Sequence, residues 1–189
     1  AIEQYDALQP DLVLMDLNMP ELDGISAIRE ITTRWPNACV LALTTFGTNA
    51  YVVEALRAGA SGYLTKDATR IDLVAGMEQA LRGDMPLSPA VRRELVSELA
   101  AKPGPDAQGA EGGTPTLSER EIELLGWLAQ GLTNAQIASR MHVSEGSVKQ
   151  YLVRVGAKLD AVSRTQILIR SIQLGFVDPH AIPMGDASD

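Results

Sequence analysis

The sequence from residue 11 to residue 82 alternates between short apolar runs and longer stretches in which apolar residues recur at helical spacing. Short apolar runs are typical of strands buried on both faces of a parallel sheet, and the stretches between them are typical of helices. The pattern predicts strands at residues 12–15, 40–43 and 62–64, and helices at about residues 25–33, 49–58 and 71–82. This alternation indicates an α/β domain with a parallel sheet.

From residue 117 onward the hydrophobic pattern is helical only. Three helix starts share a Ser or Thr at the N-cap position, with apolar residues just before the cap and at the fourth helical position. These caps are Ser118 (with Glu121), Thr133 (with Gln136) and Ser144. The third helix is predicted at about residues 145–159, and a fourth at about residues 164–174, ending at Gly175. The short turn Met141–Val143 predicts a helix-turn-helix.

Between these two regions, Ser88 and Pro89 predict the start of a helix at about residues 90–100. Residues 102–115 are rich in Gly and Pro, which is typical of a flexible linker. We therefore expect an α/β domain at residues 1–86, a linker helix and flexible linker at 87–116, an all-α four-helix domain at 117–178 and a tail at 179–189.

The 189 residues are 46% apolar and carry a net charge of −8, so two modest cores are expected. Residues 1–100 hold 8 basic and 14 acidic side chains, whereas residues 114–189 hold 7 and 8. An acidic total argues against non-specific coating of nucleic acid but allows a local basic face. A single cysteine, Cys39, and the lack of an apolar run of membrane-spanning length lead us to expect a cytoplasmic protein without membrane contact.

Three polar side chains follow the predicted strands of the α/β domain. Asp16 ends the first strand, Thr44 ends the second, and Lys66 lies just past the third. Because the carboxyl ends of parallel strands meet at one edge of a sheet, a carboxylate, a hydroxyl and an ammonium group should converge there. A phosphorylated aspartate needs this set, together with a divalent cation.

The segments Asp16-Leu-Asn-Met-Pro, Thr44-Thr45 and Gly59-Ala-Ser-Gly-Tyr-Leu-Thr-Lys66 resemble the receiver domains of bacterial two-component response regulators. The resemblance implies a flavodoxin-like receiver in which Asp16 is the phosphoacceptor. It further implies that Thr44 is the switch hydroxyl, that Lys66 binds the phosphate, and that Tyr63 is the aromatic side chain that moves with Thr44. Asp16 and the backbone carbonyl of Asn18 would bind Mg²⁺.

One part of the receiver pattern has no counterpart here. Such receivers hold Mg²⁺ with an acidic pair after a first strand, and that strand, a helix and a second strand precede the phosphoacceptor. Only fifteen residues precede Asp16, and Asp6 and Asp11 stand at a helix end and a strand start. We therefore expect a receiver that is N-terminally incomplete by roughly forty residues. The strand at residues 12–17 should keep an open apolar edge. Asp16 of this chain should be phosphorylated poorly.

The helical domain carries a second resemblance. The segments Leu117–Ile122, Gly131–Ala138 and Val143–Lys149, followed by Lys158-Leu159, are similar to the LuxR/NarL-type DNA-binding domain over about residues 115–178. Apolar residues at helical spacing can form the core of its helix pair, and they are Ile137, Ala138, Met141, Val148, Leu152 and Val155. The helix at residues 145–159 is then the recognition helix, whose outer side enters the major groove of DNA.

Residues outside that apolar stripe are the candidate DNA contacts. We expect Lys149 to bind a phosphate or a guanine edge, Gln150 to bind adenine, and Val153 to touch a thymine methyl group. The residues expected to serve phosphates are Arg154, Lys158, Thr133 and Asn134. Residues 144–160 hold three basic and two acidic side chains, so this face is only mildly basic. A monomer should therefore bind DNA modestly, and we expect the protein to act as a homodimer.

Three residues of the recognition helix depart from the family pattern. Ser147 replaces a usual threonine and remains a candidate DNA contact, and Tyr151 replaces a usual histidine. Gly156 is expected to interrupt the helix at a cost of roughly 1 kcal/mol relative to alanine. The operator sequence of a relative therefore does not transfer to this chain.

Together the two resemblances imply a cytoplasmic transcriptional response regulator that is not an enzyme. Its partners would be promoter DNA, a sensor histidine kinase and a second copy of the chain. One alternative is a DNA-binding regulator whose first domain is a phosphorylation-independent interaction or dimerisation module. A second alternative is an aspartate-nucleophile hydrolase, but such enzymes usually place a second acid where this chain has Asn18.

Overall fold

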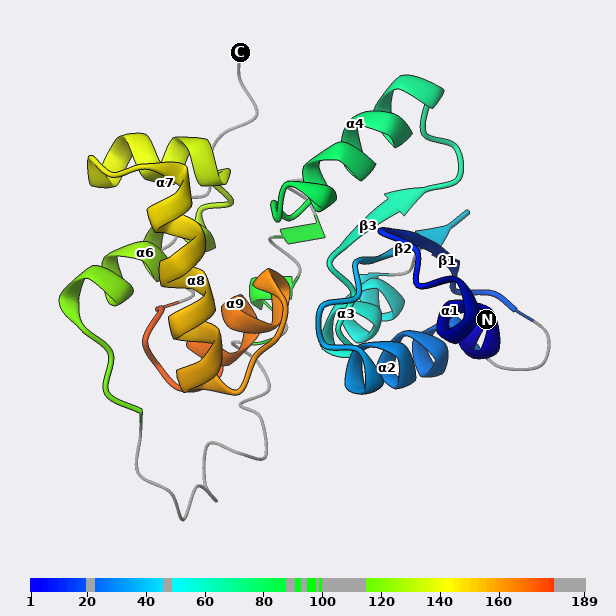
Figure 1. Cartoon of the computed structure of the whole chain (residues 1–189), viewed down its shortest axis with the longest axis horizontal. Coiled ribbons are helices and arrows are strands. Elements are labelled where there is room, and N and C mark those ends of the chain that lie inside the picture. The colour runs from blue at the N-terminus through cyan, green and yellow to red at the C-terminus, as the bar shows by residue number, and fades with distance from the viewer. Residues whose placement is uncertain are drawn as a thin grey trace. The chain divides into compact units, whose positions relative to one another are not determined.

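The computed structural model describes residues 1–19, 23–45, 49–87, 91–92, 95–97, 99 and 115–178, without the side chains of residues 49 and 50. The chain divides into two compact units, residues 1–91 with 162–166 and residues 92–161 with 167–189. The first unit contains a sheet, whereas the second is helical (Figure 1). None of the described helices combines the length and hydropathy needed to span a bilayer.

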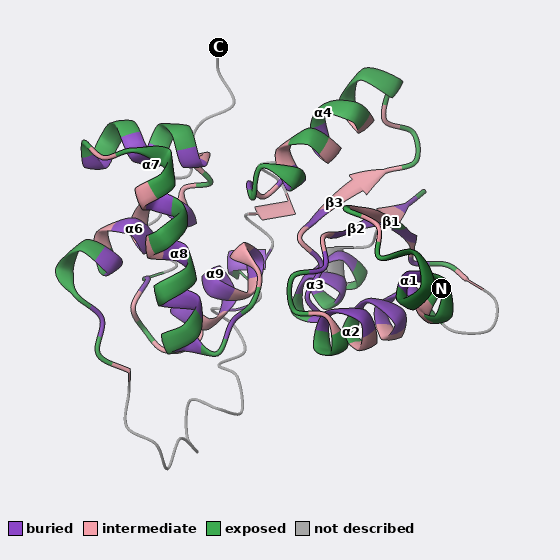
Figure 2. Cartoon of the chain, viewed as in Figure 1, coloured by how far each residue is buried: buried purple, intermediate pink, exposed green. Residues whose placement is uncertain are grey.

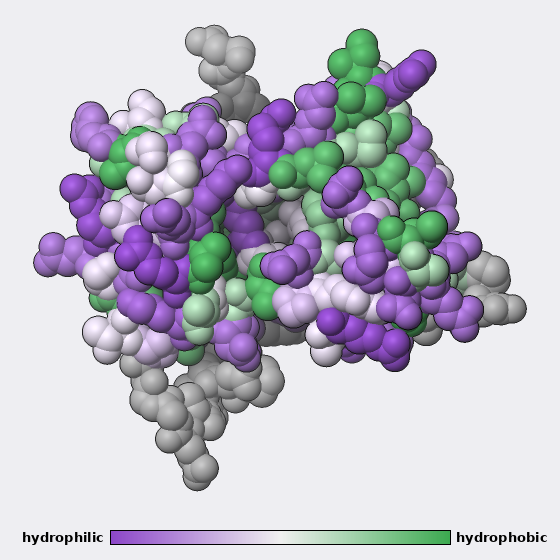
Figure 3. All heavy atoms as spheres, in the orientation of Figure 1, coloured by the Kyte–Doolittle hydropathy of each residue, from purple (hydrophilic) through white to green (hydrophobic). Residues whose placement is uncertain are grey.

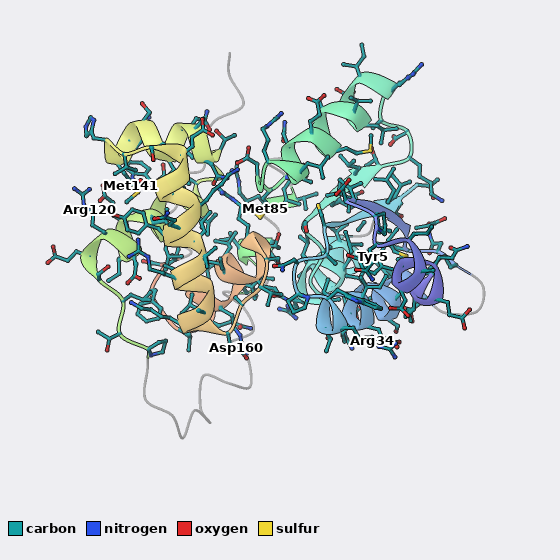
Figure 4. The ribbon with its side chains drawn as sticks, in the orientation of Figure 1. Tyr5, Arg34, Met85, Arg120, Met141 and Asp160 are labelled. Atoms are coloured by element: carbon teal, nitrogen blue, oxygen red, sulfur yellow. The ribbon has the colours of Figure 1, made fainter. Side chains whose placement is uncertain are left out.

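The first unit alternates helices and strands. Its strands are β1 (Val13–Asp16), β2 (Val40–Thr44) and β3 (Gly62–Thr65), and its helices are α1 (Ile2–Leu8), α2 (Gly24–Arg34), α3 (Asn49–Arg57) and α4 (Arg70–Leu81). The three strands and three helices predicted for residues 11–82 are confirmed, each with ends shifted by at most one residue. Helix α1 is anchored by Tyr5, labelled in Figure 4, whose ring centroid lies 4.9 Å from that of Trp35.

The sheet is parallel in the order β1-β2-β3, as the alternation predicts. Asp16 pairs in register with Leu43, and Thr44 pairs with Thr65. The carboxyl ends of all three strands therefore lie at one edge of the sheet, which is the edge where a functional site was expected.

Helices cover the two faces of the sheet unequally. Met15, Val40 and Ala42 lie on one face and are buried, and α2 contacts both of their strands. On the opposite face α4 contacts β3, and a Cβ atom on Gly76 would lie 2.6 Å from Cδ2 of Leu64. A larger residue at position 76 would therefore fit only if the Leu64 side chain moved.

Apolar side chains remain exposed in the first unit. They are Leu8, Leu14, Tyr51, Ile71, Val74 and Leu81, and Figure 3 shows hydrophobic surface gathered over α4. Among the described strands β1 pairs only with β2, and a groove of about 420 Å³ lies along α1 and β1. Within the described part of the chain, β1 is therefore an edge strand with one side unpaired, as expected.

The second unit contains α6 (Glu119–Ala129), α7 (Asn134–Met141), α8 (Glu145–Leu159) and most of α9 (Arg164–Gln173). All three predicted N-caps are confirmed: Ser118 and Thr133 form capping boxes, and the Ser144 side chain accepts the N–H of Ser147. Their buried faces, purple in Figure 2, form the core, which includes Leu124, Leu125, Leu128, Ile137, Met141, Val148, Val155 and Leu168.

The predicted helix at residues 90–100 lies partly outside the described residues. Those that are described, at 91–92, 95–97 and 99, are helical. Of the predicted linker, residues 102–114 lie outside the described part of the chain, as does the predicted tail at 179–189.

Gly156 does not interrupt the recognition helix, so that expectation was wrong. Helix α8 is continuous from Glu145 to Leu159, and Gly156 is buried within it. A Cβ atom at this position would lie 2.5 Å from the carbonyl oxygen of Ala161. The same stretch of backbone makes a hydrogen bond from the Ala161 N–H to the Gly156 carbonyl. Glycine is therefore needed because the chain after α8 packs directly against the helix.

Candidate functional site

Asp16 and Lys66 meet at the carboxyl edge of the sheet, as the sequence predicts. The Lys66 ammonium donates to Oδ2 of Asp16 over 2.5 Å, and the Asn18 N–H donates to Oδ1 over 3.0 Å. Both charged side chains are 33% exposed, so the carboxylate is reachable from solvent. The hydrogen bond from Lys66, and next that from Asn18, lower the pKa of Asp16. The carboxylate is thus ionised and held in one orientation.

The backbone of Thr44 is hydrogen-bonded at the same carboxyl edge of the sheet. The Lys66 N–H donates to the Thr44 carbonyl over 2.8 Å. Thr44 follows Leu43, the register partner of Asp16, so its side chain belongs to the opposite face of the sheet. That side chain is buried, at 2% exposure. In this conformation the hydroxyl therefore faces away from the Asp16 carboxylate.

Tyr63 lies on β3 in register with Ala42 and is half-buried. Burial, and next the negative charge of Asp67, raise the pKa of the Tyr63 phenol. The phenol is therefore neutral at physiological pH.

The residues at this edge supply few ligands for a metal ion. Asp16 offers a carboxylate and Asn18 a backbone carbonyl, whereas Mg²⁺ requires near-octahedral coordination by six oxygens. Within the described residues no group of three His, Cys, Asp or Glu side chains could hold a metal ion. The described residues do not by themselves form a Mg²⁺ site.

The second candidate site is the outer side of α8. Val148, Leu152 and Val155 are buried against the rest of the unit. Lys149, Gln150 and Arg154 are exposed, and Val153 is 73% exposed although it is apolar. A single exposed apolar side chain is common on protein surfaces, so the exposure of Val153 makes it available for a contact but does not by itself indicate one.

Arg154 is held against an aromatic ring on its own helix. Its guanidinium carbon lies 4.8 Å from the centre of the Tyr151 ring, and its Nε donates to the Gln150 carbonyl over 3.4 Å. A cation over an aromatic face is stabilised by about 0.5–1 kcal/mol at an exposed site. Arg154 is therefore restrained before it meets any partner.

Three further predicted DNA contacts lie at helix starts. Thr133 and Gln136 satisfy each other's backbone N–H groups in the α7 capping box. Asn134 is buried, at 3% exposure. Ser147 lies in the first turn of α8, with its hydroxyl 2.9 Å from that of Ser144. These residues define the start of each helix, where the Thr133 and Ser147 N–H groups already donate within the caps.

Lys158 makes a contact that the sequence did not reveal. Its Nζ donates to Oε2 of Glu121 over 2.7 Å, and the Glu121 side chain is only 6% exposed. The capping box had identified Glu121 only as a partner of Ser118. Because 37 positions separate Glu121 from Lys158, no local spacing rule could connect them.

Two sequence families match the chain. The family described as "Response regulator receiver domain" matches residues 1–78. The family described as "Bacterial regulatory proteins, luxR family" matches residues 115–171. The matched ranges hold the Asp16–Lys66 edge and the helix-turn-helix, respectively.

Curated relatives share both parts. The uncharacterized transcriptional regulatory protein YxjL of Bacillus subtilis is 38% identical over 170 residues, covering 89% of this chain and 77% of the relative. The transcriptional regulatory protein LnrK of the same organism is 36% identical over 178 residues, covering 93% and 81%. The nitrate/nitrite response regulator protein NarL of Escherichia coli is 33% identical over 168 residues, covering 89% and 76%.

Among solved structures, the response regulator ChrA of a heme-sensing two-component system is 35% identical, covering 89% of this chain and 78% of that one, with a TM-score of 0.40. The relatives are transcription regulators, and response regulators of this type act with promoter DNA and sensor kinases. The chain belongs to the family of two-component response regulators that combine a receiver domain with a LuxR-type DNA-binding domain.

Proposed function

We propose that phosphorylation of Asp16 controls this transcription regulator and that the outer side of α8 reads its promoter DNA. The observation that carries the first half is the contact between the Lys66 ammonium and the solvent-accessible Asp16 carboxylate. A phosphoryl group on Asp16 places new anionic oxygens beside the same ammonium. The cation that orients the carboxylate before transfer thus also neutralises charge afterwards.

The transfer step is a displacement at phosphorus. An Asp16 carboxylate oxygen attacks the phosphorus of a phosphohistidine on a sensor kinase, the new P–O bond forms, and the P–N bond breaks with its electrons going to the imidazole. Thr44 is buried beforehand. For its hydroxyl to reach the phosphoryl oxygens, the end of β2 must rearrange, and the half-buried Tyr63 is the neighbouring aromatic side chain that moves with it.

In this proposal each residue on the outer side of α8 contacts the DNA group that suits its chemistry. Lys149 contacts a phosphate or guanine edge, Gln150 contacts adenine, and Val153 contacts a thymine methyl group. Arg154, already stacked on Tyr151, binds a backbone phosphate. The starts of α7 and α8, marked by Thr133, Asn134 and Ser147, present N–H groups to neighbouring phosphates.

Two copies of the chain are needed for firm binding because one recognition helix offers few cations. A two-fold dimer places two recognition helices about one turn of DNA apart. We place the protein in the cytoplasm because its partners, promoter DNA and a phosphorylated kinase domain, are there.

A second candidate is a DNA-binding regulator whose first unit serves only as an interaction or dimerisation module. Two observations favour it. The described residues offer too few metal ligands around Asp16, and Ile71, Val74 and Leu81 leave α4 with an exposed apolar side. This alternative predicts DNA binding that does not respond to phosphoryl donors.

The experiment treats the 189-residue chain with excess acetyl phosphate and locates the label by mass spectrometry of proteolytic fragments. We expect slow labelling that is confined to Asp16 and absent from Asp16→Asn. Asp11→Asn is the matched control, because Asp11 precedes β1 and lies outside the Lys66 contact. Label that persists in Asp16→Asn would place the acceptor elsewhere, and no label in any variant would favour the module.

A further inference from the structure

The buried carboxylate of Glu121 gathers three hydrogen bonds on one oxygen. Its Oε2 accepts from the Ser118 N–H over 2.7 Å, from the Ser118 hydroxyl over 3.0 Å and from the Lys158 ammonium over 2.7 Å. Glu121 lies in the first turn of α6, whereas Lys158 lies in the last turn of α8. The cluster therefore joins the start of one helix to the end of the recognition helix.

The Lys158 ammonium is bound by a carboxylate of its own unit. Lys149 and Lys158 are separated by nine residues, which is about two and a half turns at 3.6 residues per turn. The two lysines therefore project from opposite sides of the helix. Lys149 is exposed and has no such partner among the described residues, whereas the Lys158 side chain, although 41% exposed, places its ammonium on the buried Glu121 carboxylate.

We propose that Lys158 is a positioning residue, which braces the recognition helix against α6 through Glu121 and thereby sets how Lys149, Gln150 and Val153 enter the groove. This inference rests on the proposed role of α8 in reading DNA. It replaces the expectation that Lys158 contacts a phosphate.

A small tilt of α8 at Lys158 would displace the base-contacting residues at the other end of the helix. At 1.5 Å of rise per residue, Lys149 lies about 13 Å along the axis from Lys158, so a tilt of about 10° at the brace moves Lys149 by roughly 2 Å. Hydrogen bonds to base edges are lost over smaller displacements than that. Phosphate contacts made by flexible side chains tolerate it better, because a point charge can follow its partner.

The two possible roles of Lys158, positioning the helix through Glu121 or contacting a phosphate, predict different effects of its removal on DNA binding. Removing a phosphate contact weakens binding to every sequence alike and reduces the salt slope by about 1. Removing a brace lowers the ratio of specific to non-specific affinity and leaves the salt slope unchanged. Glu121 separates the two further: deleting its negative charge strengthens a purely electrostatic complex but weakens a braced one.

The test uses the full 189-residue chain and two DNA probes. The specific probe is a duplex enriched by the wild-type chain from a randomised library, and the non-specific probe is a shuffled duplex of the same composition. The variants are Lys158→Met, Glu121→Met, the double variant and Lys158→Arg. Arg120→Met is the matched control, because Arg120 pairs over 3.0 Å with Glu123 on the exposed side of α6 (Figure 4). Thermal unfolding is recorded for each, and Glu121→Gln replaces Glu121→Met if the latter does not fold.

We expect Lys158→Met and Glu121→Met each to lower the affinity ratio by about tenfold, with little further loss in the double variant. Lys158→Arg should restore most of the ratio, and Arg120→Met should not change it. A reduced salt slope with an unchanged ratio in Lys158→Met would overturn the proposal, as would stronger binding by Glu121→Met. Variants that are less stable but retain the full ratio would show a structural role only and also overturn it. If the wild-type chain enriches no sequence, the proposed function itself fails, and the positioning role fails with it.

Discussion

Lys66 and Asp16 are joined across the full width of the described sheet, because Lys66 follows β3 and Asp16 ends β1. The strand between them, β2, contributes Thr44, whose carbonyl accepts the Lys66 N–H over 2.8 Å. A single lysine thus links the carboxylate on one strand with the backbone of the switch candidate on the next. A change at Asp16 can therefore be transmitted to the end of β2 through contacts that already exist.

The first prediction concerns Lys66→Met, which removes the main cause of the lowered Asp16 pKa. A carboxyl group with a lowered pKa in the folded state contributes stability above its unfolded pKa of about 3.9, and this contribution is lost as the pH falls through the folded value. The pair is one-third exposed, so the loss at neutral pH should be under about 1 kcal/mol.

Urea unfolding of wild type and Lys66→Met at neutral pH and at about pH 3 measures the effect. We expect the difference in unfolding free energy to shrink at the lower pH. An equal difference at both pH values would mean that Lys66 stabilises the unit by packing rather than through Asp16.

The second prediction compares two helical glycines in the second unit. Gly156→Ala should destabilise the unit by about 1–3 kcal/mol, because the new Cβ would lie 2.5 Å from the Ala161 carbonyl oxygen. Gly126→Ala should instead stabilise it by about 0.5–1 kcal/mol, since nothing lies within 4 Å of a Cβ there. Thermal unfolding of both variants tests this difference. Equal shifts in the melting temperature of the two variants would contradict the packing seen around Gly156.

The third prediction concerns the methyl contact of Val153. Replacing the thymines of the enriched duplex one at a time with deoxyuridine removes only the methyl group. We expect one or two such replacements to weaken wild-type binding by about threefold to tenfold and to have no further effect on Val153→Ala. Val162→Ala is the control, because Val162 is also exposed but lies beyond α8. Equal sensitivity to deoxyuridine in wild type and Val153→Ala would rule out the contact.

The elements of this fold follow closely from the sequence because their signals are local. Apolar runs set the strand limits, and the caps Ser118, Thr133 and Ser144 set the helix starts, so both were predicted within about a residue. The closeness of Lys66 to Asp16 also follows, since parallel strand ends share an edge.

What the sequence did not predict depends on side-chain direction and on contacts between distant positions. The buried Thr44 hydroxyl depends on the pleat at the very end of β2, the need for Gly156 depends on the path of the chain after α8, and the Glu121–Lys158 contact joins residues 37 positions apart. None of these has a fixed spacing along the chain.

If phosphorylation of Asp16 controls this regulator, it should raise the affinity of α8 for DNA. The most direct measurement is the affinity of the chain for its enriched duplex, with and without acetyl phosphate, in wild type and Asp16→Asn, with the phosphorylated fraction of each sample read by intact mass. We predict that affinity rises in proportion to the phosphorylated fraction of wild type and does not change in Asp16→Asn. Unchanged affinity in a wild-type sample that is demonstrably phosphorylated at Asp16 would contradict the account.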